Sequence, residues 1–195
     1  MRLLIVSLFL LSLVSACEDE APPPRPAAQH TELELLRDKI KANPEDAEAL
    51  YSLADLYDRS NMYQEEIDLL QKVVALKPDM GYAYLRMGNA YNRLAQYQNA
   101  VNSYQKARKY MPKNPVVYNN IAISYGHLGK TDNEIESLKK AISLRSQYSS
   151  ARFNLGMAFL KKGARGEALK QYEALNTFDT GMAKALKKEI DAKAH

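Results

Sequence analysis

Few side chains in this sequence have the types and spacing that catalysis or metal binding requires. Its histidines are His30, His127 and His195, which are too far apart in the chain to form a metal-ligand motif. Cys17 is the single cysteine, so no internal disulfide can form. The sequence also lacks a phosphate-binding glycine loop, a dinucleotide fingerprint and a nucleophile elbow. We therefore expect no catalytic residues, no metal, no cofactor and no small-molecule substrate.

Other side chains suit binding better than catalysis. Four asparagines, Asn89, Asn92, Asn119 and Asn120, could donate and accept the hydrogen bonds that the backbone of an extended peptide offers. Further along, Phe153, Met157 and Leu160 follow one another at the spacing of one helix face. We expect these three to form a continuous exposed apolar stripe, a kind of surface that often marks an interaction site. The alternative is that the C-terminal helix or self-association covers the stripe. Both sets require helices to position them.

An internal repeat of 34 residues predicts those helices. Its four copies, without gaps, are residues 47–80, 81–114, 115–148 and 149–182. Positions 4, 7, 8 and 11 of each copy form the apolar face of one helix, and positions 20, 24, 27 and 30 form that of a second. Position 8 is small and position 11 is aromatic in all copies: Ala54, Gly88, Ala122 and Gly156, then Tyr57, Tyr91, Tyr125 and Phe159. A single pair of helices cannot bury these faces, but stacked pairs can.

This pattern resembles the tetratricopeptide repeat, a helix–turn–helix unit of 34 residues. The resemblance covers residues 47–182 and implies an all-α fold, a right-handed α-solenoid. Solenoid ends need capping elements. We expect an N-terminal cap helix in residues 31–44 and a C-terminal cap helix in residues 183–195.

The resemblance also predicts a binding surface. In tetratricopeptide proteins the first helix of each repeat lines a concave groove that holds a protein or peptide partner. The family's clamp for a C-terminal carboxylate needs Lys and Asn at positions where this chain has Tyr51 and Asp55, so we do not expect that mode of binding. The expected groove residues are Tyr51, Tyr82, Leu85, Asn89, Asn92, Asn119, Asn120, Ile123, Phe153, Asn154, Met157 and Leu160.

Two glutamates depart from the family pattern. Glu66 and Glu134 stand at position 20, where the family normally has alanine. We expect their aliphatic stems to pack while the carboxylates reach water or a neighbouring donor. The alternative is that they present a charge to a ligand.

The N-terminus has the features of a secretory signal. The apolar run from Leu3 to Val14 is shorter than the roughly 20 residues that a membrane-spanning helix needs. The run ends in Leu-Val-Ser-Ala before Cys17, which resembles the lipobox of bacterial lipoproteins. That resemblance implies a signal peptide over residues 1–16, a lipidated Cys17 and a proline-rich linker to residue 30. The alternative is an ordinary signal peptide. Glutamate rather than aspartate after Cys17 favours the outer over the inner membrane.

Together these features predict a lipid-anchored adaptor or scaffold of the bacterial envelope that faces the periplasm and binds a protein or peptide partner. The net charge of +4 is too small to indicate nucleic-acid binding. The alternative is a structural subunit that forms a homo-oligomer through its apolar stripe.

Overall fold

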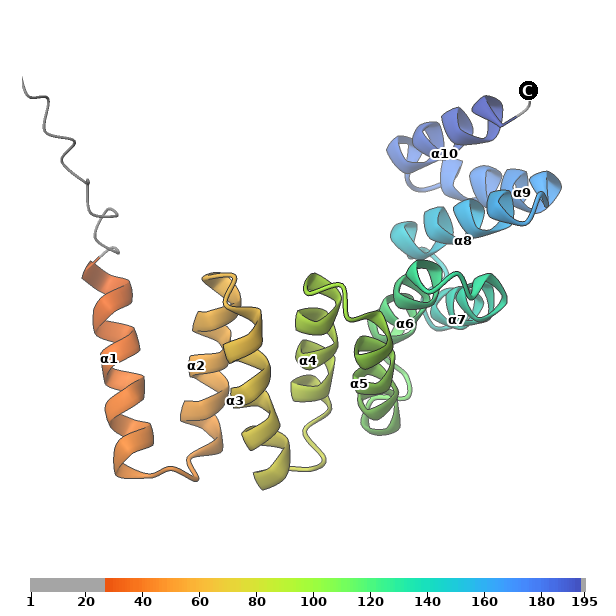
Figure 1. Ribbon diagram of the computed structural model, residues 1–195. Coiled ribbons are helices and arrows are strands. Elements are labelled where there is room, and N and C mark those ends of the chain that lie inside the picture. Colours follow the sequence, from red (N-terminus) through yellow and green to blue (C-terminus); the bar gives the residue numbers. More distant parts are fainter. Residues whose placement is uncertain (1–26, 194–195) are drawn as a thin grey trace, which may run out of the picture.

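The computed structural model describes residues 27–193, with side chains from Thr31 onward, and within that range the chain is all α-helical. Ten helices stack side by side in chain order, and the stack turns after the fifth (Figure 1). This confirms the predicted α-solenoid. The predicted signal peptide and Cys17 lie outside the described residues. The helices are α1 (Ala27–Ala42), α2 (Ala47–Arg59), α3 (Tyr63–Leu76), α4 (Gly81–Arg93), α5 (Tyr97–Tyr110), α6 (Pro115–His127), α7 (Thr131–Leu144), α8 (Ser149–Lys161), α9 (Arg165–Asn176) and α10 (Thr180–Ala192).

The two terminal helices differ in extent from the sequence prediction. Helix α1 begins at Ala27, so residues 27–30 belong to a helix rather than to the proline-rich linker. Helix α10 begins at Thr180 because Asp179 caps it, with a carboxylate oxygen 3.0 Å from the backbone nitrogen of Met182. This hydrogen bond lowers the pKa of Asp179.

Position 8 of the repeat sets how closely neighbouring helices approach. A Cβ added at Gly88 would collide with the ring of Tyr104 on α5, and one at Gly156 would collide with Leu186 on α10. Ala54 and Ala122 occupy the same position in the other two repeats and are fully buried. Helix α10 therefore packs on α8 as the first helix of a further repeat would, and closes the stack with Ala183, Leu186 and Ile190.

The turn inside each repeat uses one left-handed residue at the same position. Asn61, Ala95, Gly129 and Gly163 have φ values of 58°, 56°, 71° and 73°. Glycine adopts this conformation without steric cost, whereas an alanine Cβ crowds the following carbonyl oxygen. Ala95 is therefore the strained member of the set, and the strain is tolerated because the stacked helices fix the turn.

This turn position offers a test of local strain. We expect Ala95→Gly to raise the free energy of unfolding by up to about 1 kcal/mol, because it relieves the left-handed strain. The matched change Gly129→Ala should lower it by a similar amount, since a Cβ there meets no atom within 4 Å and only the backbone conformation resists it. Urea denaturation measures both. Stabilisation by Gly129→Ala would contradict this explanation.

Candidate functional site

Two hollows lie along the face formed by the first helices of the repeats. The first has a volume of about 410 Å³ and is lined mainly by α4, with contributions from α2, α3, α5 and α6. The second, of about 260 Å³, is lined by α6, α7 and α8. Ile123 on α6 lines both, so the hollows are adjacent. We call this surface the inner groove.

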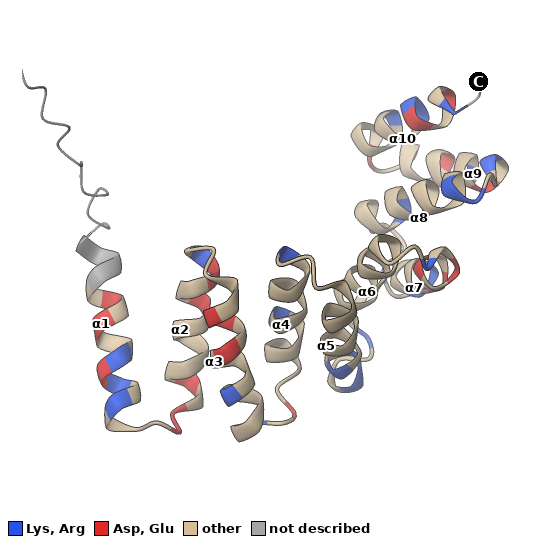
Figure 2. Ribbon diagram, viewed as in Figure 1, with Lys and Arg blue, Asp and Glu red and all other residues tan. Residues whose placement is uncertain are grey.

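Arg86 on α4 organises the N-terminal end of the inner groove. Its guanidinium lies 2.6 Å from Asp55 on α2 and 3.3 Å from Glu66 on α3, and it also donates to the carbonyl oxygen of Ala54. The same group lies 5.2 Å from the ring centre of Tyr51, within cation–π range. Acidic residues are concentrated on α2 and α3, the two helices that precede α4 (Figure 2). Arg86 thus joins the first repeat to the second.

Glu66 is the most deeply buried charged group of the described chain. Its Oε1 accepts from Arg86, but its buried Oε2 has no hydrogen-bond partner among residues 31–193. Burial and the nearby charge of Asp58 raise the pKa of Glu66 to about 7, against the opposing effect of Arg86. The carboxyl group of Glu66, which lines the inner groove, therefore titrates near neutral pH.

A network of amides and hydroxyls holds the middle of the inner groove. The hydroxyl of Tyr104 on α5 donates to Oδ1 of Asn89 at 2.9 Å and accepts from Nδ2 of Asn92 at 3.0 Å. From α6, Asn120 donates to the same Oδ1 of Asn89, and Ser124 donates to Asn92. Burial raises the pKa of the Tyr104 phenol, so its hydroxyl keeps the proton that it donates. The network fixes these side chains before any partner binds.

The C-terminal end repeats the pairing of an acid with a cation from the next repeat. Glu134 on α7 is 6% exposed, and both its oxygens lie within 3.3 Å of Nζ of Lys161 on α8. The carboxylate fits because Gly126 on α6 has no Cβ, which would lie 2.8 Å from Oε1 of Glu134. Both glutamates therefore reach a neighbouring donor, as expected, and each donor comes from the following repeat.

The predicted exposed apolar stripe on α8 is wrong. Leu160 is only 6% exposed and belongs to the same hydrophobic cluster as Leu186 and Ile190 of α10. Phe153 and Met157 are half-buried and pack against that cluster. Because α10 takes the place of a further repeat, it and the neighbouring helices cover most of the surface that the sequence left open.

The other predicted groove residues divide by exposure. Tyr82 and Ile123 are the exposed apolar side chains, at 60% and 37%. Leu85 is half-buried and packs against the cluster of buried residues around Tyr104. Asn119 is 4% exposed and accepts from Asn154 of the next repeat at 3.2 Å.

Sequence reasoning missed two residues of the inner groove. Tyr104 stands at position 24, one of the core positions of the second helix, and Arg86 is not among the predicted groove residues. The signal for Arg86 was available: an acid at position 20, Glu66, is followed by a cation at position 6 of the next repeat. A buried acid requires such a partner.

Some kinds of site are absent from the described part of the chain. Residues 31–193 bring together no group of three or more His, Asp or Glu side chains that could hold a metal ion. Between residues 27 and 193, no helix combines the length and apolarity needed to cross a bilayer.

Comparison with protein families settles the repeat type. Models described as tetratricopeptide repeats match residues 33–81 and 116–148, and a third, described as a TPR repeat, matches residues 88–129. The chain is a tetratricopeptide-repeat protein. No curated protein sequence matches it.

Solved structures share the fold of this tetratricopeptide-repeat protein. A crystal structure of MamA is 26% identical, with a TM-score of 0.73, over 86% of this chain and 87% of that one. MamA from Desulfovibrio magneticus RS-1, at 20% identity and a TM-score of 0.72, matches over 79% and 89%. YrrB, described as having an unusual peptide-binding site, is 25% identical, with a TM-score of 0.67, over 83% and 88%.

The raised pKa of Glu66 predicts a pH dependence of stability. The folded state holds a proton that the unfolded state releases between pH 4.5 and about 7, so the free energy of unfolding should fall as pH rises through that window. Glu66→Gln removes this contribution. The free energy of unfolding of the variant, measured relative to that of the unmodified chain, should rise by on the order of 1–3 kcal/mol from pH 5 to pH 8.

Urea denaturation at a series of pH values measures this effect. Glu65→Gln changes an exposed carboxylate in the same turn of α3 and serves as the matched control for loss of charge. If Glu66→Gln and Glu65→Gln have the same pH dependence, the burial of Glu66 does not act as described.

Proposed function

We propose that this chain is a protein-interaction adaptor whose inner groove binds an extended segment of a partner protein. The observation that carries the proposal is the pair of amide groups left open by the network. Both hydrogen bonds to Asn89 go to its Oδ1, and within residues 31–193 its Nδ2 makes none. Asn154 donates through Nδ2, which leaves its Oδ1 free within the same range.

These two groups complement a peptide backbone. An open N–H donor at Asn89 suits a backbone carbonyl, and an open acceptor at Asn154 suits a backbone N–H. The exposed side chains of Tyr82 and Ile123 add apolar contact on the same helices, α4 and α6. Because internal hydrogen bonds already hold the amides, a partner would lose little affinity to ordering them. YrrB, which is described as binding peptide, has a similar fold and supports this proposal.

No observation on the described residues favours the alternative of a self-associating structural subunit. That alternative depended on a continuous exposed stripe on α8. With Leu160 buried and Phe153 and Met157 half-buried, the stripe offers a second copy little apolar surface.

Removing the open amides tests the groove. We expect the double variant Asn89→Ala, Asn154→Ala to bind its partner roughly tenfold more weakly, since two partner backbone groups would lose their hydrogen bonds. Crosslinking and pull-down from the native membrane identify the partner, and titration with the captured segment gives the affinity. Asn102→Ala on the exposed side of α5 is the matched control.

Tyr82→Ser with Ile123→Ser forms an independent pair for the same assay, because both side chains are exposed and neither should alter thermal stability much. Equal capture by the unmodified chain and both groove variants would contradict the proposal.

We further propose that Cys17 carries a lipid that anchors the protein in the envelope, with the solenoid in the periplasm and the outer membrane favoured over the inner. The lipobox resemblance before Cys17 supports this step. Lipid on the thiol together with an acyl chain on the new amino group would provide the two signals that stable anchoring needs. The predicted linker would hold the inner groove away from the membrane surface.

Metabolic labelling tests the anchor. Expressed in a Gram-negative host with labelled palmitate, the unmodified chain should incorporate label and fractionate with the outer membrane. Cys17→Ser should lose the label and keep the mass of the precursor, whereas Ser12→Ala, within the apolar run, should retain both label and cleavage. Label on the Cys17→Ser chain would contradict lipidation at this residue.

A further inference from the structure

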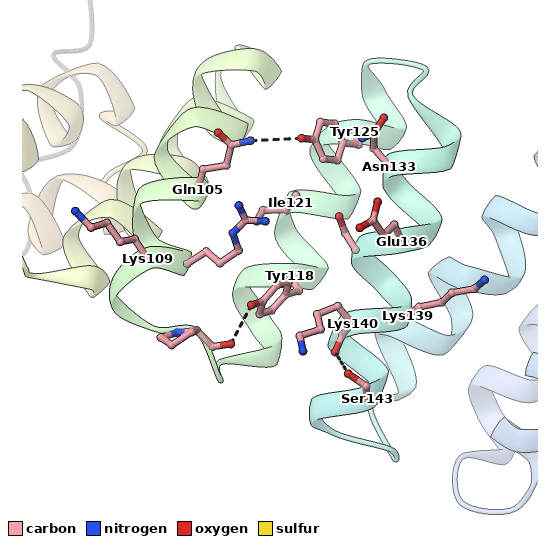
Figure 3. Close-up of a pocket in the computed structure, with 13 residues that line it drawn as sticks. Gln105, Lys109, Tyr118, Ile121, Tyr125, Asn133, Glu136, Lys139, Lys140 and Ser143 are labelled. Carbon is pink, nitrogen blue, oxygen red and sulfur yellow. Dashed lines mark hydrogen bonds between the residues drawn. The ribbon is translucent and has the colours of Figure 1, made fainter.

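A larger cleft lies on the other side of α6 from the inner groove. It has a volume of about 790 Å³ and is bounded by α5 and α7, with α6 as its floor (Figure 3). Ile121 lines this cleft and Ile123 lines the inner groove. Residues two apart on a helix point to nearly opposite sides, so the two surfaces are separate. We call this surface the outer cleft.

The walls of the outer cleft are strongly cationic. Arg108 and Lys109 come from α5, and Lys139 and Lys140 from α7, against a single carboxylate, that of Glu136. Lys140 extends into the cleft beside Tyr118, while Lys109 and Lys139 reach outward from the two walls (Figure 3). Within residues 31–193, none of the four cations has a carboxylate within 4.0 Å. Lys109 lies 5.3 Å from the ring centre of Tyr110 and Lys139 lies 5.9 Å from that of Phe159. A ring does not neutralise a cation, so all four charges can still attract an anionic partner.

The neighbouring repeats show that this charge is specific to one cleft. The positions of Arg108 and Lys109 hold Val74 and Ala75 one repeat earlier, and Ile142 and Ser143 one repeat later. The positions of Lys139 and Lys140 hold Gln105 and Lys106 in the preceding repeat, and Glu173 and Ala174 in the following one. The equivalent cleft between α3 and α5 thus has one cation of four, and that between α7 and α9 has none. Helix geometry alone does not require the four charges between α5 and α7.

The floor of the cleft indicates which kind of anion fits. Tyr118 and Ile121, at 9% and 3% exposure, lie below the cationic rim. A flat anionic bilayer would contact the rim but could not reach this floor. An extended polypeptide could reach both, with an apolar side chain on the floor and carboxylates against the walls. The side chains of Asn133 and Ser137 add hydrogen-bonding groups along the α7 wall.

We propose that the outer cleft is a second protein-binding surface, which takes an acidic segment with apolar side chains between its carboxylates. Ion pairs between such a segment and Arg108 or Lys140 would form over a partly desolvated floor, where they are stronger than on an open surface. The chain would then bind two partner segments at once, one on each side of α6. This role does not depend on the inner groove, because the two surfaces share no residue.

Fluorescence anisotropy tests the proposal on the full chain in non-ionic detergent micelles. The probe is a labelled peptide in which glutamate pairs alternate with leucines, and its matched form has glutamine for every glutamate. The unmodified chain should bind the glutamate peptide at least about tenfold more tightly than the glutamine peptide, because each charge-assisted contact to a cation adds free energy. Arg108→Glu with Lys140→Glu should abolish that preference.

The matched control reverses the same amount of charge elsewhere. Lys184→Glu with Lys188→Glu lies on exposed positions of α10 and should leave peptide binding within about twofold, since screening weakens distant charges. If both double variants lose the preference for the glutamate peptide to the same extent, the attraction is non-specific and the proposal is overturned. So would the absence of peptide binding by the unmodified chain up to about 1 mM.

A last experiment measures binding of the same variants to vesicles rich in phosphatidylglycerol. If Arg108→Glu with Lys140→Glu weakens vesicle binding but not peptide binding, the cleft recognises a lipid surface and the proposal is wrong. Asn89→Ala, Asn154→Ala should bind the acidic peptide as the unmodified chain does. This separates failure of the outer cleft from failure of the inner groove.

Discussion

The contact between Gly88 and Tyr104 joins the fold of this protein to its candidate site. Because Gly88 has no Cβ, the ring of Tyr104 crosses the interface between α4 and α5 and is almost fully buried. Its hydroxyl then emerges at the inner groove and bonds to Asn89 and Asn92. A side chain at position 8 would displace the ring, and the amides would lose the group that orders them. Core packing and groove geometry therefore depend on one steric relation.

The repeats alternate between two combinations of residues at positions 8, 20 and 24, where the two helices of a repeat meet. The first and third combine alanine at position 8 with glutamate at position 20 and leucine at position 24, as in Ala54, Glu66 and Leu70. The second and fourth combine glycine, alanine and tyrosine, as in Gly88, Ala100 and Tyr104. In the first three repeats a polar group is thereby delivered from the second helix to the inner face: a carboxylate, a phenol hydroxyl, then a carboxylate. Each buried carboxylate takes its cation from the following repeat, which adds an electrostatic link to the apolar stacking.

The sequence predicted the parts of this structure that depend on local periodicity. Spacing of apolar and small residues identified the helix pairs, and positions 2 and 9 of the repeat identified Tyr82 and Ile123 as inward-facing. It could not decide whether the C-terminal helix covers α8, so the burial of Leu160 remained an alternative to an exposed stripe. Nor could it identify the side-chain hydrogen bonds between repeats. The bond from Asn120 to Asn89, for example, joins residues 31 positions apart in the chain. Only stacked helices bring such residues together.

The central claim is that a partner segment lies along the inner groove and bonds to amides that the fold already holds. Side-chain amide resonances report this directly, because each asparagine gives its own NMR signals. The account predicts that adding the captured partner segment shifts the side-chain amide signals of Asn89 and Asn154 and leaves exposed Asn102 unchanged. Shifts confined to the opposite face of α6, at Tyr118 and Tyr125, with Asn89 and Asn154 unaffected, would contradict it.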